Sequence, residues 1–231
     1  MGVLKNTKTC ILVLDIDGTL TDSVAMHQEA FVQALRMLDI PQLDTNWDSY
    51  QQHTDTGILA EAVARADLPK KSPQQVSAFE ADLTERFLRS LRSNALREIR
   101  GARKLTEYAV QSKWGVVYAT GGVRGVSRAK LEAVGIPYSE ETLITSSEYE
   151  NRTELVASAI QRAKEVYRVS EPIRILSLGD GRWDLEVATA LNIDFLGIGA
   201  GTRSAAFLAN SGAEVLPDLS AACDRLERYN P

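Results

Sequence analysis

Five short apolar runs, and a shorter sixth, are spread along the chain and are rich in branched side chains. They lack strict alternation between apolar and polar positions, a pattern typical of strands in a parallel sheet covered on both faces. Apolar residues at helical spacing follow several runs. Strand and helix therefore alternate, which predicts a Rossmann-like, doubly wound α/β domain. The predicted strands are residues 10–16, 114–120, 142–145, 173–180, 194–199 and 214–216, and the clearest helices are 155–166, 183–191 and 203–210.

A long interval without a strand pattern separates the first two predicted strands. Its apolar residues recur at three- and four-residue steps, as in Phe79, Leu83 and Phe87. Such spacing predicts amphipathic helices with one buried face. We therefore expect an all-helical inserted domain at residues 22–95, and an α/β core formed by residues 1–21 and 96–231.

Composition and charge narrow the class of protein. The 231 residues carry a net charge of −5, so the chain lacks the overall basic field that nucleic-acid binding favours. The first apolar run is too short for a membrane span. Cys10 and Cys223 are too few and too far apart for a disulfide framework or a metal-binding pair. These features favour a cytoplasmic protein without nucleic-acid or membrane partners, and they leave its oligomeric state open.

Acidic, hydroxyl and glycine residues follow three of the predicted strands. In open α/β sheets, ligands bind beyond the carboxyl ends of the strands, so these residues are candidates for a shared site. They are Asp15, Asp17, Gly18 and Thr19 after the first strand, Thr120, Gly121 and Gly122 after the second, and Asp180 and Asp184 after the fourth.

Four carboxylates at one edge of a sheet require compensation. Two like charges about 4 Å apart repel by about 4 kcal/mol at an effective dielectric constant near 20. A cation must therefore neutralise the cluster, or some of its acids must bind protons. Hard oxygen ligands favour Mg²⁺, which commonly bridges to a phosphate oxygen. Glycines allow backbone amides to approach an anion closely, and the hydroxyl of Thr120 adds a donor. The pattern predicts a metal-bridged phosphate.

The sequence stretches that carry these residues resemble a known set of motifs. DIDGTLTD at residues 15–22, ATGG at 119–122, a later basic residue and GDGRWD at 179–184 are similar to the four motifs of the haloacid dehalogenase superfamily. The insertion resembles the helical cap of its phosphoglycolate phosphatase-like members. The resemblance implies the haloacid dehalogenase fold and Mg²⁺-dependent hydrolysis of a small phosphorylated metabolite.

The resemblance also implies a role for each motif residue. Asp15 would be the nucleophile that forms an aspartyl-phosphate, and Asp17 the general acid and base. Thr120 and the amide of Gly121 would hold the phosphoryl oxygens, and Gly18 and Gly122 are further candidates for substrate binding. The implied Mg²⁺ ligands are Asp15, Asp17 through its backbone carbonyl, Asp180, and Asp184 directly or as a supporting partner.

The basic residue of the third motif has two candidates. A lysine is usual at this position in the family, whereas Arg152 is our best match at the head of a predicted helix. An arginine can also neutralise charge and offers several donors. Lys130 is the competitor, but the segment AKLEAVGI around it predicts an amphipathic helix with Lys130 on its solvent side.

Other functions and roles remain open at the level of sequence. A phosphomutase similar to β-phosphoglucomutase would use the same aspartates, and a catalytically silent binding protein could keep them. His27 can reach a substrate or be a structural or exposed helix residue. The stretch His53–Gly57 either faces the active site or simply begins a helix, with Thr54 or Thr56 as its N-cap.

Overall fold

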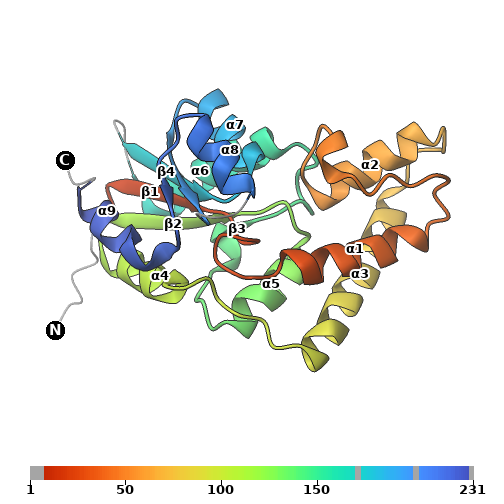
Figure 1. The fold of residues 1–231 in the computed structure, drawn as a ribbon, viewed down its shortest axis with the longest axis horizontal. Coiled ribbons are helices and arrows are strands. Elements are labelled where there is room, and N and C mark those ends of the chain that lie inside the picture. The colour runs from red at the N-terminus through yellow and green to blue at the C-terminus, as the bar shows by residue number, and fades with distance from the viewer. Residues whose placement is uncertain (1–7, 170–172, 200–202, 229–231) are drawn as a thin grey trace.

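The computed structural model describes residues 8–169, 173–199 and 203–228. Within them, a fully parallel six-stranded sheet has the strand order β3-β2-β1-β4-β5-β6 (Figure 1). The predicted fold class is therefore confirmed, and each predicted strand is present in a slightly shorter form. The strands are β1 (Cys10–Leu14), β2 (Trp114–Ala119), β3 (Leu143–Ile144), β4 (Arg174–Gly179), β5 (Asp194–Ile198) and β6 (Val215–Leu216).

Helices cover both faces of this sheet (Figure 1). Successive side chains of a strand point to opposite faces, so every residue of β1 is buried. Leu12 packs among side chains of α4 and α9, whereas Val13 packs among those of α6. This two-sided burial explains why the strand pattern lacks alternation. The core helices are α4 (Ala102–Gln111), α5 (Arg124–Ala133), α6 (Arg152–Tyr167), α7 (Arg182–Ala190), α8 (Arg203–Asn210) and α9 (Ala222–Arg228).

Three α-helices come between β1 and the core helix α4 and lie to one side of the sheet (Figure 1). They share a hydrophobic cluster in which Phe31, Leu83 and Phe87 are buried. The same cluster includes Val126 of α5, so the insertion packs directly against a helix of the core. These helices are α1 (Val24–Arg36), α2 (Asp55–Arg65) and α3 (Pro73–Ser93).

The two chain segments that enter and leave the insertion lie side by side. Thr21 and Glu98 form an antiparallel bridge, and the amide of Asp22 donates to the carbonyl of Arg97 at 2.9 Å. These paired segments coincide with the ends of the expected inserted domain. The proposed boundaries at residues 22 and 95 remain a prediction.

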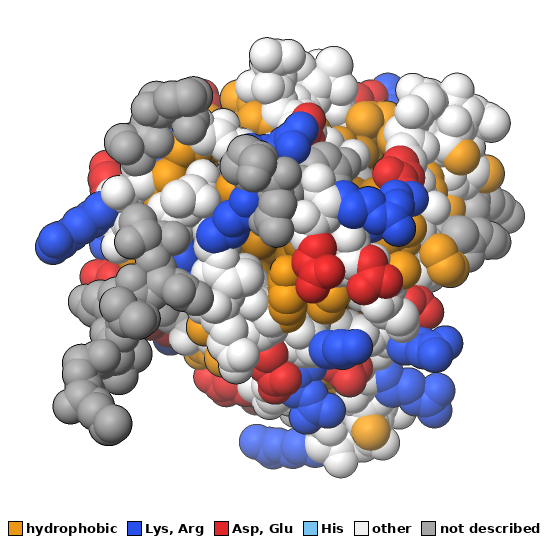
Figure 2. Space-filling model, turned by 90° about the vertical axis from the view of Figure 1, so that its left-hand side faces the viewer, with side chains coloured by type: hydrophobic (Ala, Val, Ile, Leu, Met, Phe, Trp, Pro, Cys, Tyr) orange, Lys and Arg blue, Asp and Glu red, His pale blue; other side chains and the backbone are white. Residues whose placement is uncertain are grey.

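Charges of both signs are interspersed on the face of the molecule that Figure 2 shows. This mixture agrees with the small net charge of the sequence. Among the helices of the described ranges, none has the length and apolar character needed to cross a membrane.

Candidate active site

The site forms where the connections of the sheet change direction. From β1 the chain continues to β2 on one side, whereas β4 lies on the other side of β1. Such a switch point opens a crevice beyond the carboxyl ends of the strands. Asp15 and Asp180 directly follow β1 and β4, and Asp184 lies in the first turn of α7. Three side chains from separate parts of the sequence therefore meet there.

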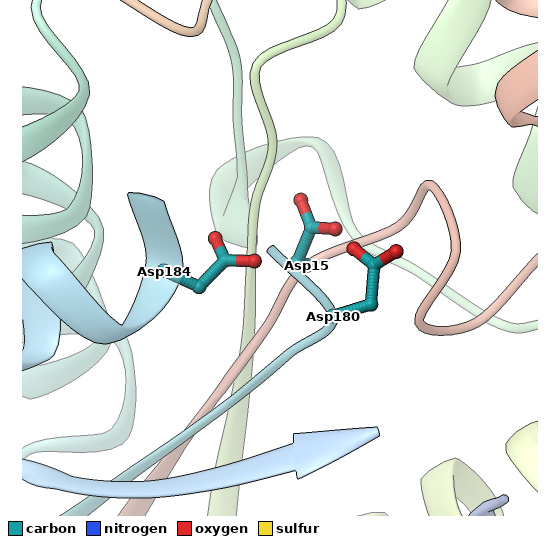
Figure 3. Close-up of side chains that lie close together, drawn as sticks. All are labelled: Asp15, Asp180 and Asp184. Carbon is teal, nitrogen blue, oxygen red and sulfur yellow. The ribbon is translucent and has the colours of Figure 1, made fainter. Parts of the chain in front are cut away.

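The carboxylates of Asp15, Asp180 and Asp184 converge (Figure 3). One oxygen from each lies within 4.8 Å of the others. Burial and the charge of Asp184 raise the pKa of Asp15 to about 7, although the guanidinium of Arg152 opposes the shift. Burial and the charge of Asp15 raise the pKa of Asp180 to about 8. This cluster holds its negative charge at a free-energy cost that a cation would offset.

Arg152 supplies one positive charge to this cluster. It begins α6, where Asn151 is the N-cap, and its side chain is 7% exposed. Nη2 donates to Asp15 at 2.9 Å and to Asp184 at 2.6 Å, while Nη1 donates to the carbonyl of His53 in the insertion at 3.1 Å. Among the described atoms, none accepts a hydrogen bond from the buried Nε. Of the two candidate cations, Arg152 is therefore the one beside the clustered acids.

Lys130 lies elsewhere, and its predicted position on the solvent side of α5 is wrong. The side chain is fully buried, and Nζ donates to Asp17 at 2.6 Å. The sequence pattern reveals one apolar face of α5, which meets the sheet through Leu131. The insertion covers a second face, where Val126 and Ala129 join its hydrophobic cluster. Lys130 is buried because α5 lies between the core and the insertion.

The carboxylate of Asp17 is separate from the three-carboxylate cluster and has its own partners. Besides Lys130, it accepts a hydrogen bond from Ser23, and Nδ1 of His27 lies 3.5 Å away. Burial alone would raise the pKa of Asp17, but Lys130 and His27 outweigh it and hold that pKa far below its usual range. Asp17 is therefore ionised in this arrangement.

His27 links Asp17 to the insertion. Its Nε2 lies 3.0 Å from both carboxylate oxygens of Asp55, and its Nδ1 contacts Nζ of Lys130. Burial and the charge of Lys130 lower the pKa of His27, but the carboxylates of Asp55 and Asp17 outweigh both and raise it to about 9. With a proton on Nε2, His27 donates to Asp55 in both its neutral and its charged form. His27 is thus buried in a polar network, and the possibility of an exposed residue is excluded.

Asp55 in turn fixes the insertion to the loop after β2. Its carboxylate accepts from the amide of Val123 at 2.9 Å, and its own amide donates to the carbonyl of Gly121 at 2.8 Å. The sequence analysis singled out the stretch that contains Asp55, but not this residue as a partner of His27. A pair separated by 28 residues in different helices leaves no signal in a single sequence.

The glycines of the motifs are required by space. A Cβ on Gly18, which has φ +75°, would lie 2.1 Å from Oδ2 of Asp180, and one on Gly121 would lie 2.4 Å from the carbonyl of His53. The amide of Gly18 already donates to Thr21, and that of Gly122 donates to Thr120 Oγ1. The roles of these glycines and of buried Thr120 in phosphate binding remain predictions.

A cavity of about 310 Å³ lies over this edge of the sheet. Its lining includes Asp15, Asp17 and Arg152 from the core and His53 from the insertion. The stretch around His53 satisfies both sequence interpretations, because it faces the cavity and Thr54 is the N-cap of α2. Its hydroxyl oxygen accepts from the amide of Gly57 at 3.1 Å.

The cluster of three carboxylates fits a hard divalent cation. Carboxylate oxygens from Asp15, Asp180 and Asp184 are ligands of the kind that such ions prefer. One guanidinium cannot balance three carboxylates, and burial together with this excess of negative charge raises the pKa values of Asp15 and Asp180. A divalent ion would supply the missing charge. The structure does not distinguish one divalent metal from another.

Residues 11–192 match the family model of haloacid dehalogenase-like hydrolases. The chain belongs to this family. The match spans strands β1 to β4 and the helical insertion, and it includes all four candidate aspartates and Arg152. The family assignment made from the motifs is therefore confirmed, and the protein is a hydrolase of this class. No protein of curated function matches the sequence.

Solved structures share the fold of this haloacid dehalogenase-like hydrolase. CbbY from Rhodobacter sphaeroides, in complex with phosphate, has a TM-score of 0.67 and 19% identity over 94% of this chain and 99% of its own. A putative β-phosphoglucomutase from Bacteroides vulgatus has a TM-score of 0.68 and 16% identity over 97% of this chain and 91% of its own. A predicted phosphoglycolate phosphatase from Haemophilus somnus has a TM-score of 0.60 and 15% identity over 97% of this chain and 100% of its own. At these identities the likeness establishes the fold alone.

Proposed function

We propose that this haloacid dehalogenase-like hydrolase is a Mg²⁺-dependent phosphatase that hydrolyses a small phosphorylated metabolite through an aspartyl-phosphate at Asp15. The observation that carries the proposal is the convergence of Asp15, Asp180 and Asp184 with the guanidinium of Arg152. The arrangement combines a nucleophilic carboxylate, a candidate metal site and a cationic donor beside one cavity. Phosphoryl transfer depends mainly on such positioning and charge neutralisation.

Each residue has a defined task in this mechanism. The carboxylate of Asp15 attacks phosphorus, and the bond from phosphorus to the ester oxygen breaks. Arg152 orients Asp15 through the hydrogen bond from Nη2. Thr120 and Gly121 would hold the remaining oxygens. Mg²⁺, held by Asp15, Asp180 and the backbone carbonyl of Asp17 with support from Asp184, would neutralise phosphoryl charge.

Asp17 would transfer the protons. The departing oxygen takes a proton from Asp17, which must first receive one from the neighbouring Lys130 or His27, since Asp17 is otherwise ionised. The resulting carboxylate then removes a proton from the water that attacks the aspartyl-phosphate. Water attack breaks the bond between Asp15 and phosphorus and releases phosphate, and Asp17 returns its proton to Lys130 or His27, which restores the enzyme.

Two other functions use the same site. A phosphomutase, the class named for the Bacteroides vulgatus structure, would pass the phosphoryl group to a second substrate hydroxyl rather than to water. A silent binding protein would have no need of the ionised Asp17 beside the cavity or of an arginine between Asp15 and Asp184. We favour the phosphatase, because the complete acidic set supports turnover. A cytoplasmic location is also proposed, since both cysteines are buried and free.

The test is turnover of p-nitrophenyl phosphate, followed with a panel of phosphorylated metabolites, with Mg²⁺ and with EDTA. We expect Mg²⁺-dependent release of inorganic phosphate. Transfer of phosphate between positions of a sugar would instead identify a mutase. The absence of turnover on every compound would favour a binding protein.

A further inference from the structure

Aromatic side chains form part of the lining of the cavity beside the carboxylates. Phe31 and Trp47 come from the insertion, with ring centroids 5.4 Å apart at an angle of 61°. His53 of the insertion stacks on Trp183 of α7, with centroids 4.5 Å apart and planes inclined by 22°. Aromatic groups from both parts of the chain therefore meet around the space next to the phosphoryl position.

This wall is held in place from behind. Phe31 packs edge-on against the buried ring of Phe79 at 5.9 Å, and Trp47 lies 6.0 Å from Tyr50. Tyr50 is itself covered by the guanidinium of Arg65, 4.3 Å from the ring centroid. A wall packed in this way offers apolar surface without first paying a large cost in side-chain entropy.

Several polar groups beside the cavity are already engaged within the protein. Asp55 is paired with His27, the hydroxyl of Thr54 donates to the carbonyl of Glu150, and that of Ser204 donates to the carbonyl of Asp180. In the described part of the chain, Arg152 is the one Lys or Arg that lines the cavity, and two carboxylates bind its Nη2. A second anionic group would lose its hydration without gaining a cation that is free of carboxylate partners.

On the basis of the proposed function, we propose that the substrate is a phosphate monoester whose remaining part is neutral, compact and predominantly apolar, with a ring that packs among Phe31, Trp47, His53 and Trp183. The size of the cavity agrees, because 310 Å³ lies at the lower end of the range of about 300–1,000 Å³ for ligand pockets. Small organic phosphates that carry a second phosphate or a carboxylate are excluded as preferred substrates.

Binding of phosphonates tests this substrate class without turnover. Isothermal titration in Mg²⁺ would compare benzylphosphonate with phosphonoacetate, which share the phosphonate and differ in an apolar ring against a carboxylate. We expect benzylphosphonate to bind at least about tenfold more tightly, the scale of discrimination available to an apolar pocket. Equal affinity, or tighter binding of phosphonoacetate, would overturn the proposal.

Variants link the preference to the aromatic wall. Trp47→Ala should weaken benzylphosphonate binding about tenfold and change phosphonoacetate binding little, because the lost surface contacts the ring alone. Phe31→Leu, which keeps an apolar side chain, tests the same wall if Trp47→Ala is unstable. Met37→Ala, at a side chain that is 66% exposed beyond α1, is the control and should leave both affinities unchanged. Equal weakening of both ligands by a wall variant would contradict the proposed contact.

Turnover separates this proposal from the proposed function. Benzyl phosphate and 2-phosphoglycolate are both alkyl esters, so their comparison limits differences in leaving-group reactivity. Preference for benzyl phosphate supports both proposals, whereas faster hydrolysis of 2-phosphoglycolate refutes the substrate class and leaves the phosphatase intact. If neither these esters nor any compound of the panel is hydrolysed but benzylphosphonate binds more tightly, the phosphatase fails and the apolar binding site stands.

Discussion

Asp15 and Lys130 are both buried charged residues, but only the position of Asp15 can be predicted from the sequence. Asp15 follows an uninterrupted apolar strand, so its place at the sheet edge can be inferred from its neighbours in sequence. Lys130 lies within a helix whose second buried face is created by the insertion. Apolar periodicity in the sequence indicates one buried face of a helix, but it does not indicate whether a distant element covers another face. For this reason Asp15 could be placed from sequence and Lys130 could not.

Asp15→Asn should abolish phosphate release while the protein stays folded. The amide has nearly the same shape but is a far weaker nucleophile, so we expect a loss of about a thousandfold or more. Burial of one negative charge is also relieved, so the melting temperature should not fall greatly. Phosphate release measures activity, and circular dichroism verifies folding. Activity near that of the wild type would refute Asp15 as the nucleophile.

Lys130→Met should destabilise the fold. Removal of one member of a buried ion pair leaves the other without compensation, at a cost of about 3–5 kcal/mol. The cost here should lie near the lower value, since the Asp17 side chain is 21% exposed and keeps His27 and Ser23. Urea denaturation measures the loss. Asp17→Asn combined with Lys130→Met provides the control. If the two residues are coupled, the double variant should lose less free energy of unfolding than the two single variants lose together. A loss equal to or larger than that sum would show that the pair is not coupled.

At the scale of elements, the strands and most helices could be predicted because each carries its own periodicity. Their contacts could not. α2 begins at Asp55 with Thr54 as its cap, as expected for a helix start, yet the same turn also reaches the loops after β2 and before α6. Local capping chemistry thus fixes where the helix begins, and long-range hydrogen bonds decide what it touches.

Thr54→Ala should weaken this contact between the insertion and the core. The substitution removes an N-cap, which typically costs about 1 kcal/mol, and also the hydrogen bond to the carbonyl of Glu150. We expect a lower free energy of unfolding by urea and faster amide exchange at Gly57. Thr54→Ser keeps the hydroxyl and should restore most of the stability. A Ser variant as unstable as the Ala variant would assign the effect to lost packing of the methyl group.

At the scale of the whole molecule, the sheet and insertion together enclose acids that would otherwise be hydrated. The folded-state pKa values of Asp15 and Asp180, about 7 and about 8, lie above the ordinary aspartate value of 3.8. The folded protein therefore binds more protons than the unfolded chain between about pH 4 and pH 8. Without a metal, these two groups should make the fold less stable as the pH rises through this window.

Mg²⁺ should reverse this trend if the proposed metal site is correct, because it binds the ionised carboxylates. Its stabilising effect should be small at pH 5 and should grow towards pH 8, reaching about 2.7 kcal/mol at a hundredfold excess over the dissociation constant. Melting temperatures with Mg²⁺ and with EDTA measure the effect. Asp180→Asn should remove most of the gain. Equal stabilisation of this variant and of the wild type at pH 8 would place the metal elsewhere.

The sequence by itself determined the parallel sheet, the helical character of the insertion and the acidic residues at the strand ends. Those features depend on local periodicity and on the rule that parallel strands present their carboxyl ends at one edge. Tertiary structure alone decided that Arg152 joins Asp15 and Asp184, that Lys130 and His27 surround Asp17, and that aromatic side chains bound the cavity. The contacts of His27 and of the aromatic side chains arise where the insertion packs on the core, whereas the pairs of Arg152 and Lys130 form between distant segments of the core itself. In both cases the side chains come from positions too far apart for any sequence spacing to record.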